Sequence, residues 1–531
     1  MKKSALFSAL FIALSVCGIT ACGKEQQYDE NNFNETGDQI VKEKITLKLF
    51  VPKHSLHSNW GDMKLFKKME ERTNIHIEFI EAPIASYASL SAASWAGDDL
   101  PDAFFTYNKA EDVAAHGRDG LIYDLTDYLD KYAPNYTALM NSHPEWKKRT
   151  LIDGKVYSTA MITDVPRDLT FKQFLNKTWI NNINDIYKND YEYADADLLP
   201  TNPSTLDEYT RILYAFKNED ANLNGNKNDE VPLSSTSMGQ TRNFILSALG
   251  HVTNSFEIGS DGKVTHCQLT NAYRRYLEYA HQLYKDGVLD ARVFEKTTTD
   301  DLSVKGYLNG SFDCAAAYLV TGAKYDKDYM AVQPLTSDIN NKKMWLQFST
   351  YCEPNCIQIP KKCKYVRELV RWLDVFYSEE GSQLASFGEE GVDWKWNNPE
   401  KTSFHFEVPD NYSIEEYRGT LTCAPGTGIP YWSKDFVLKE DGEYTSRINQ
   451  EVEEAGYVDC LVEPMPYIIL DRKDQKSINI DLVEISNVCS VFEAKVIRGD
   501  IELNDTTWNN QIDLLKRYNI QKCIDIYQKY I

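Results

Sequence analysis

The chain of 531 residues is poor in positive charge and, after its first residues, in long hydrophobic runs. It has 57 Lys and Arg against 79 Asp and Glu, a formal net charge of -22. This balance disfavours nucleic acid and a strongly anionic membrane face as partners. It weakly disfavours polyanionic substrates, although a local Lys or Arg cluster would override this. No later stretch approaches the 18 apolar residues of a spanning helix. The 42% hydrophobic and 12% aromatic content predicts a folded globule of two or three domains, or two large lobes.

Sequence motifs of catalysis are also lacking. The chain has no His-Glu-x-x-His, no Gly-x-Ser-x-Gly, no phosphate loop and no Gly-x-Gly-x-x-Gly. His54 and His57 have no obvious third metal ligand, so two loop histidines are the better interpretation. Among 79 acidic residues some carboxylate pair always resembles a glycosidase site, and this has little discriminating force. We therefore predict a protein that is not an enzyme.

Paired cysteines are absent as well. Outside Cys17 and Cys22 there are nine cysteines, an odd number, with no Cys-x-x-Cys among them. Cys352, Cys356 and Cys363 are close together but have no histidine partner, so zinc is not expected. Buried small hydrophobic side chains are the favoured interpretation. One disulfide, between Cys352 and Cys356, is left open.

The N-terminus carries the one long apolar run. Two lysines precede an apolar stretch from Ala5 to Ile19, which predicts a secretion signal rather than a spanning helix. The run ends in Thr20-Ala21-Cys22, which resembles the bacterial lipoprotein box, in which the cysteine is diacylated. We predict a signal peptide over 1–21, an acyl (palmitate-type) anchor on Cys22 and a flexible tether within 22–43. The chain is thus expected outside the cell membrane, held only by this anchor; cleavage nearby by ordinary signal peptidase is the alternative.

Strand-like alternation and helical spacing follow one another after the tether. Strands are expected over 45–51, 74–80 and 99–105, with helices over 62–73 and 87–96 between them. This order predicts an open, mainly parallel sheet, at which ligands lie beyond the carboxyl ends of the strands.

The rest of the chain predicts a second lobe of the same α/β class. Long helices are expected near 272–286 and 367–387, on either side of a strand block over 312–320 that returns the chain to the first lobe. The predicted lobe I comprises 44–165 and 305–365, and lobe II comprises 166–304 and 366–531, with a helix-rich C-terminal part. Each lobe is expected to hold a mainly parallel sheet, with a cleft between the lobes.

Side-chain oxygens alternate around Gly225, after a helix expected over 206–217. Such spacing suits a hard cation: oxygens at the first, third and fifth positions, a carbonyl at the seventh, and glycine at the sixth. Val231 occupies the twelfth position, where a glutamate is usual, so the closing ligands stay open. A solvated turn without metal is the alternative. The candidate ligands of a structural calcium site are Asp220, Asn222, Asn224, Asn226, Asn228, Asp229 and Glu230.

Motifs in a fixed order carry a resemblance over nearly the whole chain: the Cys22 box, Glu71–Ile77, Asp99–Asp102, Lys131–Asn135, Asp153–Tyr157, Asn176–Trp179, Asp220–Ser234, Arg371–Asp374 with Tyr377–Gly381, and Gly388–Trp394. In order and spacing they resemble the LplA-type, family 1 extracellular solute-binding lipoproteins of carbohydrate ABC importers. The resemblance implies a type 2 periplasmic-binding-protein fold whose two lobes close on a ligand, most often an oligosaccharide. It also implies delivery to an ABC transporter permease. The family's calcium loop has its Asp-Glu pair one residue earlier than here.

A sugar site needs aromatic faces and planar polar groups. Aromatic residues after strands or Gly/Pro turns are therefore candidates, with core packing as the alternative. For Trp372, on a helical apolar stripe, core packing is favoured. The candidate ligand-binding residues are Trp60, Trp95, Tyr107, Trp394, Trp396, Tyr431, Trp432, Glu390 and Arg371.

The sequence thus predicts a monomeric, lipid-anchored carbohydrate-binding protein of an ABC transporter. A surface glycoside hydrolase or lyase and a binding protein for a peptide or other non-sugar solute are the alternatives.

Overall fold

The computed structural model of the protein describes residues 27–531, except for 98, 165–170, 190–196, 236–237, 295–308, 316–327, 347–350, 413, 438, 440–453 and 455. The predicted signal peptide and Cys22 therefore lie outside the described residues. Within the described ranges, no helix is long and apolar enough to cross a membrane.

The predicted first sheet is confirmed. β1 (Ile45–Lys53) pairs in parallel with β2 (Ile75–Pro83) and β3 (Ala103–Phe105), and the short β13 (Ile357–Gln358) joins β3 in antiparallel orientation. The alternation in β1 buries Ile45, Leu47 and Leu49. The helix α1 (Lys64–Thr73) ends where Asn74 adopts a left-handed φ of 62°, which asparagine tolerates. The helix α2 (Tyr87–Ala96) follows β2.

The second sheet differs from its prediction. Its order is β10-β5-β9-β6, formed by β5 (Phe171–Asn176), β6 (Val231–Ser234), β9 (Asn309–Ala315) and β10 (Tyr329–Ala331). Only β6 and β9 are parallel, because β5 is antiparallel to both of its neighbours. The prediction that the strand after residue 305 returns to the first lobe is wrong. A Cβ on Gly310 of β9 would lie 2.3 Å from the Phe216 ring, so this strand is fitted closely against a helix of the second lobe.

Helices of the second lobe pack around one large core. The helix α8 begins with the capping box of Thr205 and Glu208, in which each side chain bonds the other's backbone N–H. At the centre of the core, the Gln173 amide donates to the Ser311 hydroxyl at 2.9 Å and accepts from the Thr241 hydroxyl at 3.0 Å. The helices are α7 (Lys177–Asn189), α8 (Leu206–Asn218), α9 (Gly239–Ala248) and α10 (Asn271–Lys285).

The C-terminal helices are fixed to this lobe by a buried polar cluster. Glu493, on α19 (Arg472–Arg498), accepts hydrogen bonds from Arg242 at 2.8 Å, Tyr276 at 2.7 Å and Tyr273 at 3.1 Å. These partners come from α9 and α10, so one carboxylate joins three helices. α20 (Asp505–Arg517) and α21 (Ile520–Gln528) complete the C-terminal part.

The predicted boundary of lobe II at residue 366 is also wrong. Trp372 of α13 (Val366–Asp374) is fully buried in the core of the first lobe, where its ring stacks on Phe66 and meets Phe105 edge-on. The core prediction for Trp372 is thereby confirmed. The chain returns to the first lobe between Trp345, which is in the second core, and Cys352, which is in the first. Both Cys352 and Cys356 are buried free thiols, so the disulfide left open is not formed.

The remaining described helices and strands lie either with the first sheet, in what we call the first half of the molecule, or with the second sheet, in the second half. In the first half lie α3 (Ala110–Arg118), α4 (Thr126–Tyr132), α5 (Pro134–Ser142), α6 (Pro144–Thr150), β4 (Met161–Thr163), β12 (Tyr351–Glu353), α14 (Glu379–Phe387), β14 (Trp394–Trp396), β15 (Phe404–Phe406), α15 (Ile414–Leu421), α16 (Ala424–Thr427), β16 (Tyr431–Trp432) and α17 (Lys434–Val437). Near the second half lie β7 (Phe256–Ile258), β8 (Val264–His266), β11 (Trp345–Leu346) and β17 (Leu461–Val462).

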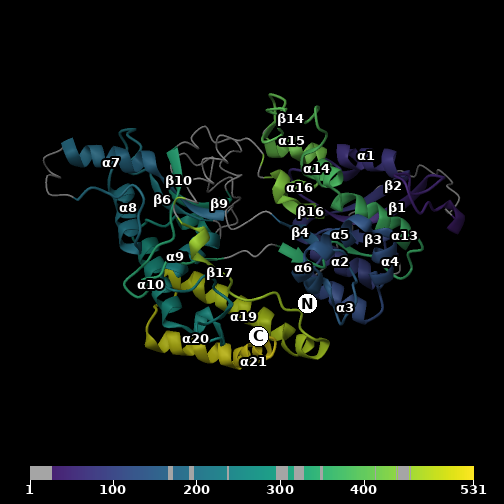
Figure 1. Ribbon diagram of the computed structural model, residues 1–531. Helices are drawn as coiled ribbons and strands as arrows, with labels where there is room; N and C mark the ends of the chain where they lie inside the picture. The colour runs from purple at the N-terminus through teal and green to yellow at the C-terminus, as the bar shows by residue number, and fades with distance from the viewer. Residues whose placement is uncertain are drawn as a thin grey trace, which may run out of the picture.

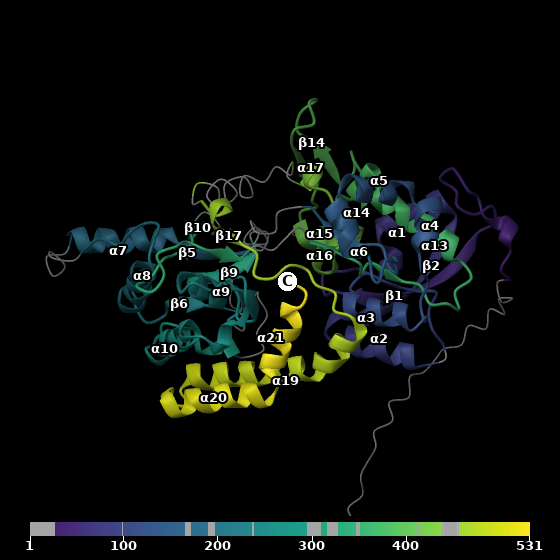
Figure 2. The same ribbon diagram turned by 60° about the horizontal axis from the view of Figure 1, so that its bottom comes forward.

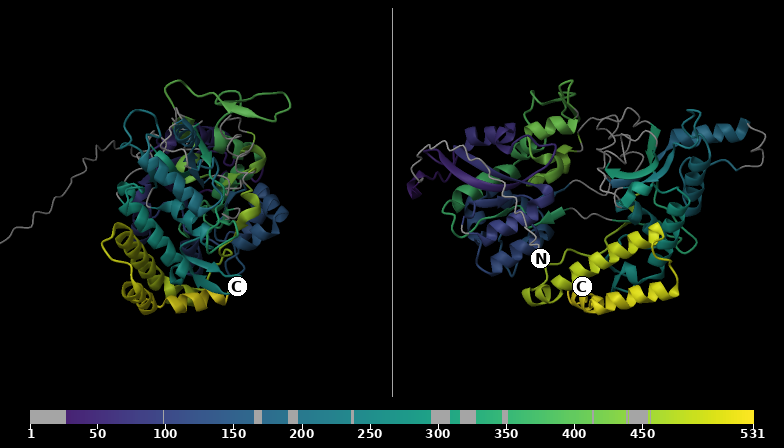
Figure 3. Two further views of the ribbon diagram at one scale, coloured as in Figure 1. Left: turned by 90° about the vertical axis from the view of Figure 1, so that its left-hand side faces the viewer. Right: turned by 180° about the vertical axis from the view of Figure 1, so that it is seen from behind.

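The two halves lie side by side, as Figures 1 and 2 show, with the first sheet in one and the second in the other. The long C-terminal helices lie beneath the second half and extend toward the first, which Figure 3 shows from behind. There Arg472 forms an ion pair with Asp119, and Arg118 donates to the Leu470 carbonyl at 3.1 Å. The C-terminal part therefore contacts both halves.

Candidate functional site

The carboxyl ends of β1, β2 and β3 meet at one edge of the first sheet, because the three strands are parallel. The loop 54–63 follows β1, the turn Ile84–Ser86 follows β2, and Thr106–Asn108 follow β3. This edge is where an open α/β sheet ordinarily binds ligands, and polar and aromatic side chains gather there.

A pocket of about 270 Å³ lies at this edge, between α2 and the residues that follow β3. It contains two of the predicted aromatic candidates, Trp95 and Tyr107. Its lining comprises Tyr87, Ala88, Ser91, Ala92, Trp95, Tyr107, Asn108, Lys109, Asp112, His116 and Gln358.

The backbone after β3 is held in an uncommon conformation. Thr106 and Tyr107 both have a φ of 56°, which costs a non-glycine residue on the order of 1–3 kcal/mol. Neighbours fix this turn: the Thr106 N–H donates to the Cys356 carbonyl at 2.6 Å, and the Tyr87 hydroxyl donates to the Thr106 carbonyl at 3.2 Å. Strain of this kind clusters at binding sites, and here it places an aromatic ring at the surface.

The aromatic rings of the pocket differ in exposure and support. Tyr107 is 42% exposed and meets the Tyr87 ring edge-on, with the ring centroids 5.5 Å apart. Trp95 stacks on Phe104 at 4.8 Å and lies 4.1 Å from the His116 ring. Its indole N–H is buried and has no hydrogen-bond partner among the described residues. The pocket therefore offers apolar ring surface that is already fixed in place.

A chain of hydrogen-bonded polar side chains runs along the pocket. The Asn108 amide donates to the Phe104 carbonyl at 3.2 Å, and Gln358 donates to Asn108 Oδ1 at 3.0 Å. His116 Nδ1 in turn lies 2.6 Å from Gln358 Oε1, which requires the proton on Nδ1. Amide, imidazole and aromatic groups in this combination suit a ligand with many hydroxyl groups.

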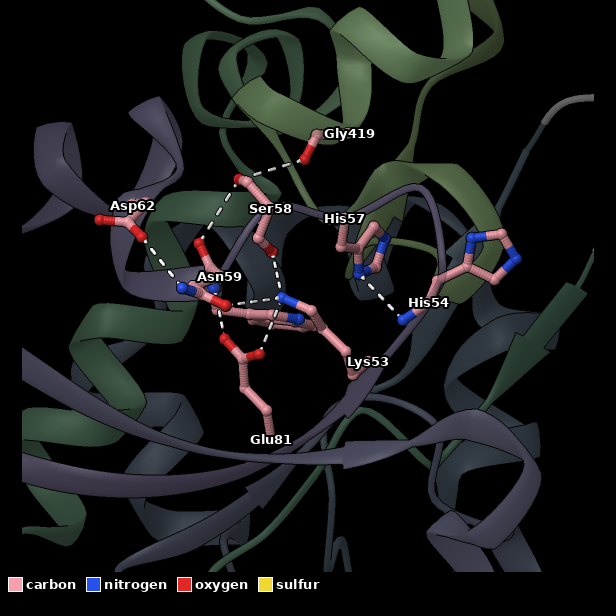
Figure 4. A network of polar contacts seen from close by, with 9 residues as sticks. Lys53, His54, His57, Ser58, Asn59, Asp62, Glu81 and Gly419 are labelled. Atoms are coloured by element: carbon pink, nitrogen blue, oxygen red, sulfur yellow. Dashed lines mark hydrogen bonds and ion pairs between the residues drawn. The ribbon is translucent and has the colours of Figure 1, made fainter.

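The loop after β1 forms a second polar network, shown in Figure 4. Lys53 Nζ lies 2.8 Å from Glu81 of β2 and 3.2 Å from Asn59 Oδ1. Glu81 also accepts from the Trp60 N–H at 2.5 Å, and Ser58 donates its N–H to the Gly419 carbonyl at 3.0 Å. The network anchors the loop to β2 on one side and to α15 on the other.

The two loop histidines are part of this packing. His57 Nε2 donates to the Pro425 carbonyl at 2.6 Å, and the His54 ring covers Gly426, where a Cβ would lie 2.5 Å from it. Burial lowers the pKa of His57 to about 4, against which the hydrogen bond to Pro425 acts only in part. In the described part of the chain no group of three His, Cys, Asp or Glu side chains is arranged to hold a metal ion. His54 and His57 are therefore loop-packing residues.

The other predicted ligand-binding residues lie elsewhere. Trp60 is fully buried and stacks on Phe66 at 5.3 Å, so its prediction as a sugar platform is wrong. Trp394 is likewise buried, in a satellite core where Trp396 and Trp432 are partly exposed. These rings pack on Phe436, Phe404 and Phe387, while Tyr431 packs against the main core of the first half. The structure does not bring this group to the pocket of Trp95 and Tyr107.

Arg371 and Glu390 are also remote from the pocket. Arg371 donates to the carbonyls of Asn34 and Gly37, so it fixes the N-terminal segment rather than pairing with Asp374. Asp374 instead accepts the N–H groups of Asn135 and Tyr136 and caps α5. Glu390 lies in a groove of about 590 Å³ beside α1, where it pairs with Lys401 at 3.4 Å.

The predicted calcium loop is a tight turn held by its own side chains. The two oxygens of Asp220 accept from the N–H groups of Asn224 at 3.0 Å and Gly225 at 2.8 Å. Asp229 accepts from the amides of Asn222 at 3.2 Å and Asn224 at 2.8 Å. Glu230 is 7% exposed, its Oε2 has no partner among the described residues, and burial together with Asp229 and Asp220 raises its pKa. The loop thus gathers carboxylates around a glycine turn.

The polar residues of the pocket were not among the predicted ligand-binding residues. Asn108 and Lys109 follow the predicted Tyr107 directly, so their position after a strand was a usable signal. Nothing in the local sequence marked His116 and Gln358 as pocket residues, because α3 and β13 bring them together from positions 242 residues apart in the chain.

Two known proteins are similar to this chain over most of its length. The chain is 24% identical to the fructooligosaccharide ABC transporter substrate-binding protein FusA of Streptococcus pneumoniae, over 98% of this chain and 97% of the relative. It is 20% identical to the lipoprotein LipO of Bacillus subtilis, over 91% of this chain and 92% of the relative. No protein-family model matches the chain.

The structure of FusA in complex with kestose matches with a TM-score of 0.76 at 21% identity, over 92% of this chain and 98% of that one. The chain has the fold of ABC-transporter substrate-binding proteins. The alginate-binding protein AlgQ2 matches this fold with a TM-score of 0.73 at 19% identity, over 93% of this chain and 99% of that one. The predicted two-lobe α/β solute-binding fold is thereby confirmed.

Proposed function

We propose that the protein captures an oligosaccharide between its two lobes and delivers it to an ABC transporter permease. The observation that carries this proposal is the similarity to FusA, which runs through both lobes and the C-terminal helices instead of one shared domain. The sugar-binding structures in the comparison share the same two-lobe fold. The protein is proposed to work as a monomer and without catalysis.

The pocket of Trp95 and Tyr107 is the proposed subsite for one sugar ring. Tyr107 supplies an exposed aromatic face on a fixed turn, and His116, Asn108 and Gln358 supply hydrogen-bonding groups at its side. One cation and one carboxylate, Lys109 and Asp112, share the lining. This balance favours a neutral oligosaccharide over a polyanionic one.

A thermal-shift panel tests the function. Kestose and nystose, alginate oligosaccharides and a tripeptide mixture are each added to the protein, and the melting temperature and the recovered ligand are measured. A neutral oligosaccharide should raise the melting temperature and be recovered intact, because ligand bound only by the folded state adds stability by mass action. Cleaved sugar would favour the hydrolase alternative, and a shift with peptides alone would favour the non-sugar one.

Replacing Tyr107 with alanine should weaken sugar binding by roughly 10- to 100-fold. The change removes an aromatic face, a loss on the order of 1.4–2.7 kcal/mol when ring contact and buried area are both counted. Isothermal titration with the sugar found in the panel measures it.

Tyr412→Ala is the matched control, because that tyrosine is 40% exposed in a different part of the first half. Unchanged affinity of Tyr107→Ala would remove this pocket from the binding site, while leaving the function itself to the panel.

We also propose a structural calcium ion in the loop Asp220–Glu230. The orphaned Glu230 oxygen, with the charges of Asp229 and Asp220 that help to raise the pKa of Glu230, fits a hard cation. The carboxylates would have to draw together around the ion, because in the described residues no three of them are arranged to hold one. Asn222 and Asn224 would have to turn their amides, because their nitrogens face Asp229 in this structure. A related structure is described as an EF-hand mutant of FusA, at a TM-score of 0.76.

Chelation of calcium should lower the melting temperature. An ion at about 100 times its dissociation constant contributes about 2.7 kcal/mol, and Asp220→Ala should abolish the response to chelator. Scanning calorimetry with and without chelator measures both. Asp185→Ala, on the exposed end of α7, should leave the response intact. An equal chelator response in Asp220→Ala would place the ion elsewhere.

The location follows as a further part of the proposal. Acylation of Cys22 after removal of 1–21 would hold the protein at the outer face of the cell membrane, beside its permease. The relative LipO is named a lipoprotein.

A further inference from the structure

The segment predicted to be a flexible tether is folded onto the first lobe. Residues 28–43, the N-terminal loop, close on themselves through a bridge between Phe33 and Val41. Ile40 and Val41 are almost completely buried, and Phe33 packs edge-on against Tyr132 of α4. The tether prediction for 22–43 is therefore wrong for these residues, because its sparse apolar side chains all face the lobe.

Two arginines of α13 hold the loop in place. Arg367 donates to the Tyr28 hydroxyl at 2.9 Å and lies 4.6 Å from the Phe33 ring. Arg371 donates to the carbonyls of Asn34 and Gly37. An ion pair between Arg72 and Asp38 at 3.0 Å adds a contact to α1. In Figures 1 and 2 the loop, drawn in purple, lies beside α4 and α13, on the side of the first half away from the second.

The docked loop shortens the connection to the proposed anchor. Six residue steps separate Cys22 from Tyr28, and they span at most about 20 Å even when fully extended. A tether that reached residue 43 would span about 70 Å. With Cys22 acylated, the surface around Tyr28 must stay within about 20 Å of the lipid headgroups.

This surface carries a local cluster of lysines in an otherwise acidic protein. Tyr28 meets Tyr365 edge-on at 5.1 Å, and directly before Tyr365 the chain reads Lys361-Lys362-Cys363-Lys364. All three lysines are exposed. We define them as the basic patch.

Apolar and aromatic groups accompany the basic patch. Lys361 Nζ lies 4.3 Å from the centroid of the Tyr123 ring, and the Lys361 backbone N–H donates to the carbonyl of Leu121, a residue that is 46% exposed. Exposed carboxylates also lie near the basic patch: Asp99, whose Oδ1 is 4.0 Å from Lys362 Nζ, Asp29, which caps the turn that follows it, and Glu30. Lysines with tyrosines and an exposed leucine are the composition that favours the headgroup region of a membrane.

We infer that the basic patch binds the anionic headgroups of the membrane in which Cys22 is anchored, and so holds the outer side of the first lobe toward the lipid. The inference rests on the proposed anchoring at Cys22 and is independent of the sugar. Each lysine near an anionic surface strengthens the contact about fivefold, and the short connection supplies a high local concentration of lipid.

The acylated full-length protein, reconstituted in vesicles, tests the inference. Vesicles hold either 30% phosphatidylglycerol in phosphatidylcholine or phosphatidylcholine alone, and the rate of acetylation of each lysine is read by mass spectrometry. On the anionic vesicles, Lys361, Lys362 and Lys364 should be modified at least about threefold more slowly than in detergent. Lys516 on α20, which is 64% exposed, should be unchanged.

A triple variant, Lys361→Gln with Lys362→Gln and Lys364→Gln, separates orientation from anchoring. It should stay on the vesicles through its acyl chains. Lys131, on α4 next to the loop, should also be acetylated more slowly in the wild-type protein on anionic vesicles, and the triple variant should lose this protection. The matched control, Lys473→Gln with Lys516→Gln and Lys522→Gln, should keep the protection of the basic patch. A Gly/Ser insertion of 20 residues between Gln27 and Tyr28 should reduce that protection.

Equal acetylation rates for the basic patch and Lys516 on anionic vesicles would overturn the inference. Equal protection on both kinds of vesicle would overturn the recognition of anionic lipid. The mass of the N-terminal peptide shows whether Cys22 is acylated. A Cys22 without acyl chains would overturn the inferred orientation on the membrane, while sugar binding in the thermal-shift panel would be unaffected.

Discussion

Replacing Glu493 with alanine is expected to lower the free energy of unfolding by about 3–5 kcal/mol. The carboxylate is almost fully buried, pairs with Arg242 at 2.8 Å and accepts from two tyrosine hydroxyls. Its removal takes a shared acceptor from two buried tyrosine hydroxyls and from Arg242, whose side chain is 19% exposed, and leaves a cavity between α9, α10 and α19. Urea unfolding followed by circular dichroism measures the change.

Two further variants test whether the loss of stability comes from the Glu493 carboxylate itself. Glu493→Gln keeps an acceptor for the tyrosines and removes the charge, so it should lie between wild type and Glu493→Ala. Glu484→Ala, a partly exposed position on the same helix, should change stability by less than about 1 kcal/mol. A loss in Glu493→Ala no larger than this would mean that the hydrophobic contacts of α19, and not the polar cluster, hold the C-terminal part.

Stability is expected to fall as the pH drops from about 6.5 toward 4. Burial lowers the pKa of His57 to about 4, and also that of His266 to about 4. In this window the unfolded chain binds protons that the folded protein excludes, so stability is complete above the unfolded pKa and is lost below it. For His57 the full loss is on the order of 3 kcal/mol.

The variant His57→Gln isolates this contribution. Its free energy of unfolding should be lower than that of wild type at pH 7 and depend less on pH between 6.5 and 4, because only His266 and His54, whose pKa burial also lowers, then supply the histidine part. His405→Gln is the control, since that histidine lies on the exposed surface. An unaltered pH slope in His57→Gln would show that His57 stays accessible to protons in the folded state.

The first sheet and the function class were predictable because their signals are local. The alternation of β1 and β2 and the helical spacing between them fix a β-α-β unit between Ile45 and Pro83. The same residues place Tyr107 after a strand, where open α/β sheets bind ligands. Loop position alone did not show which aromatic candidates are exposed to solvent, because packing decides this. Tyr107 is exposed, and Trp60 is buried beneath its own loop.

The incorrect predictions for β9, α13 and the N-terminal loop have one physical cause: surfaces far apart in the chain compete for the same segment. The strand β9 and the helix α13 are apolar enough for either lobe, and only close packing against Phe216 in one case and Phe66 in the other decides between them. The N-terminal loop has too few apolar residues to predict a fold, yet Arg367 and Arg371 supply partners for its carbonyls.

Composition and short-range spacing were enough to predict the class of protein: an acidic two-lobe α/β chain with a lipoprotein-like leader and an oxygen-rich glycine loop. These features are set by composition and by spacing within short segments, which no tertiary contact alters. The tertiary structure decided which rings face solvent, which lobe each late segment joins, and that His116 and Gln358 meet at the edge where Tyr107 emerges. Such choices depend on shape complementarity between residues hundreds of positions apart, and local sequence carries no record of it.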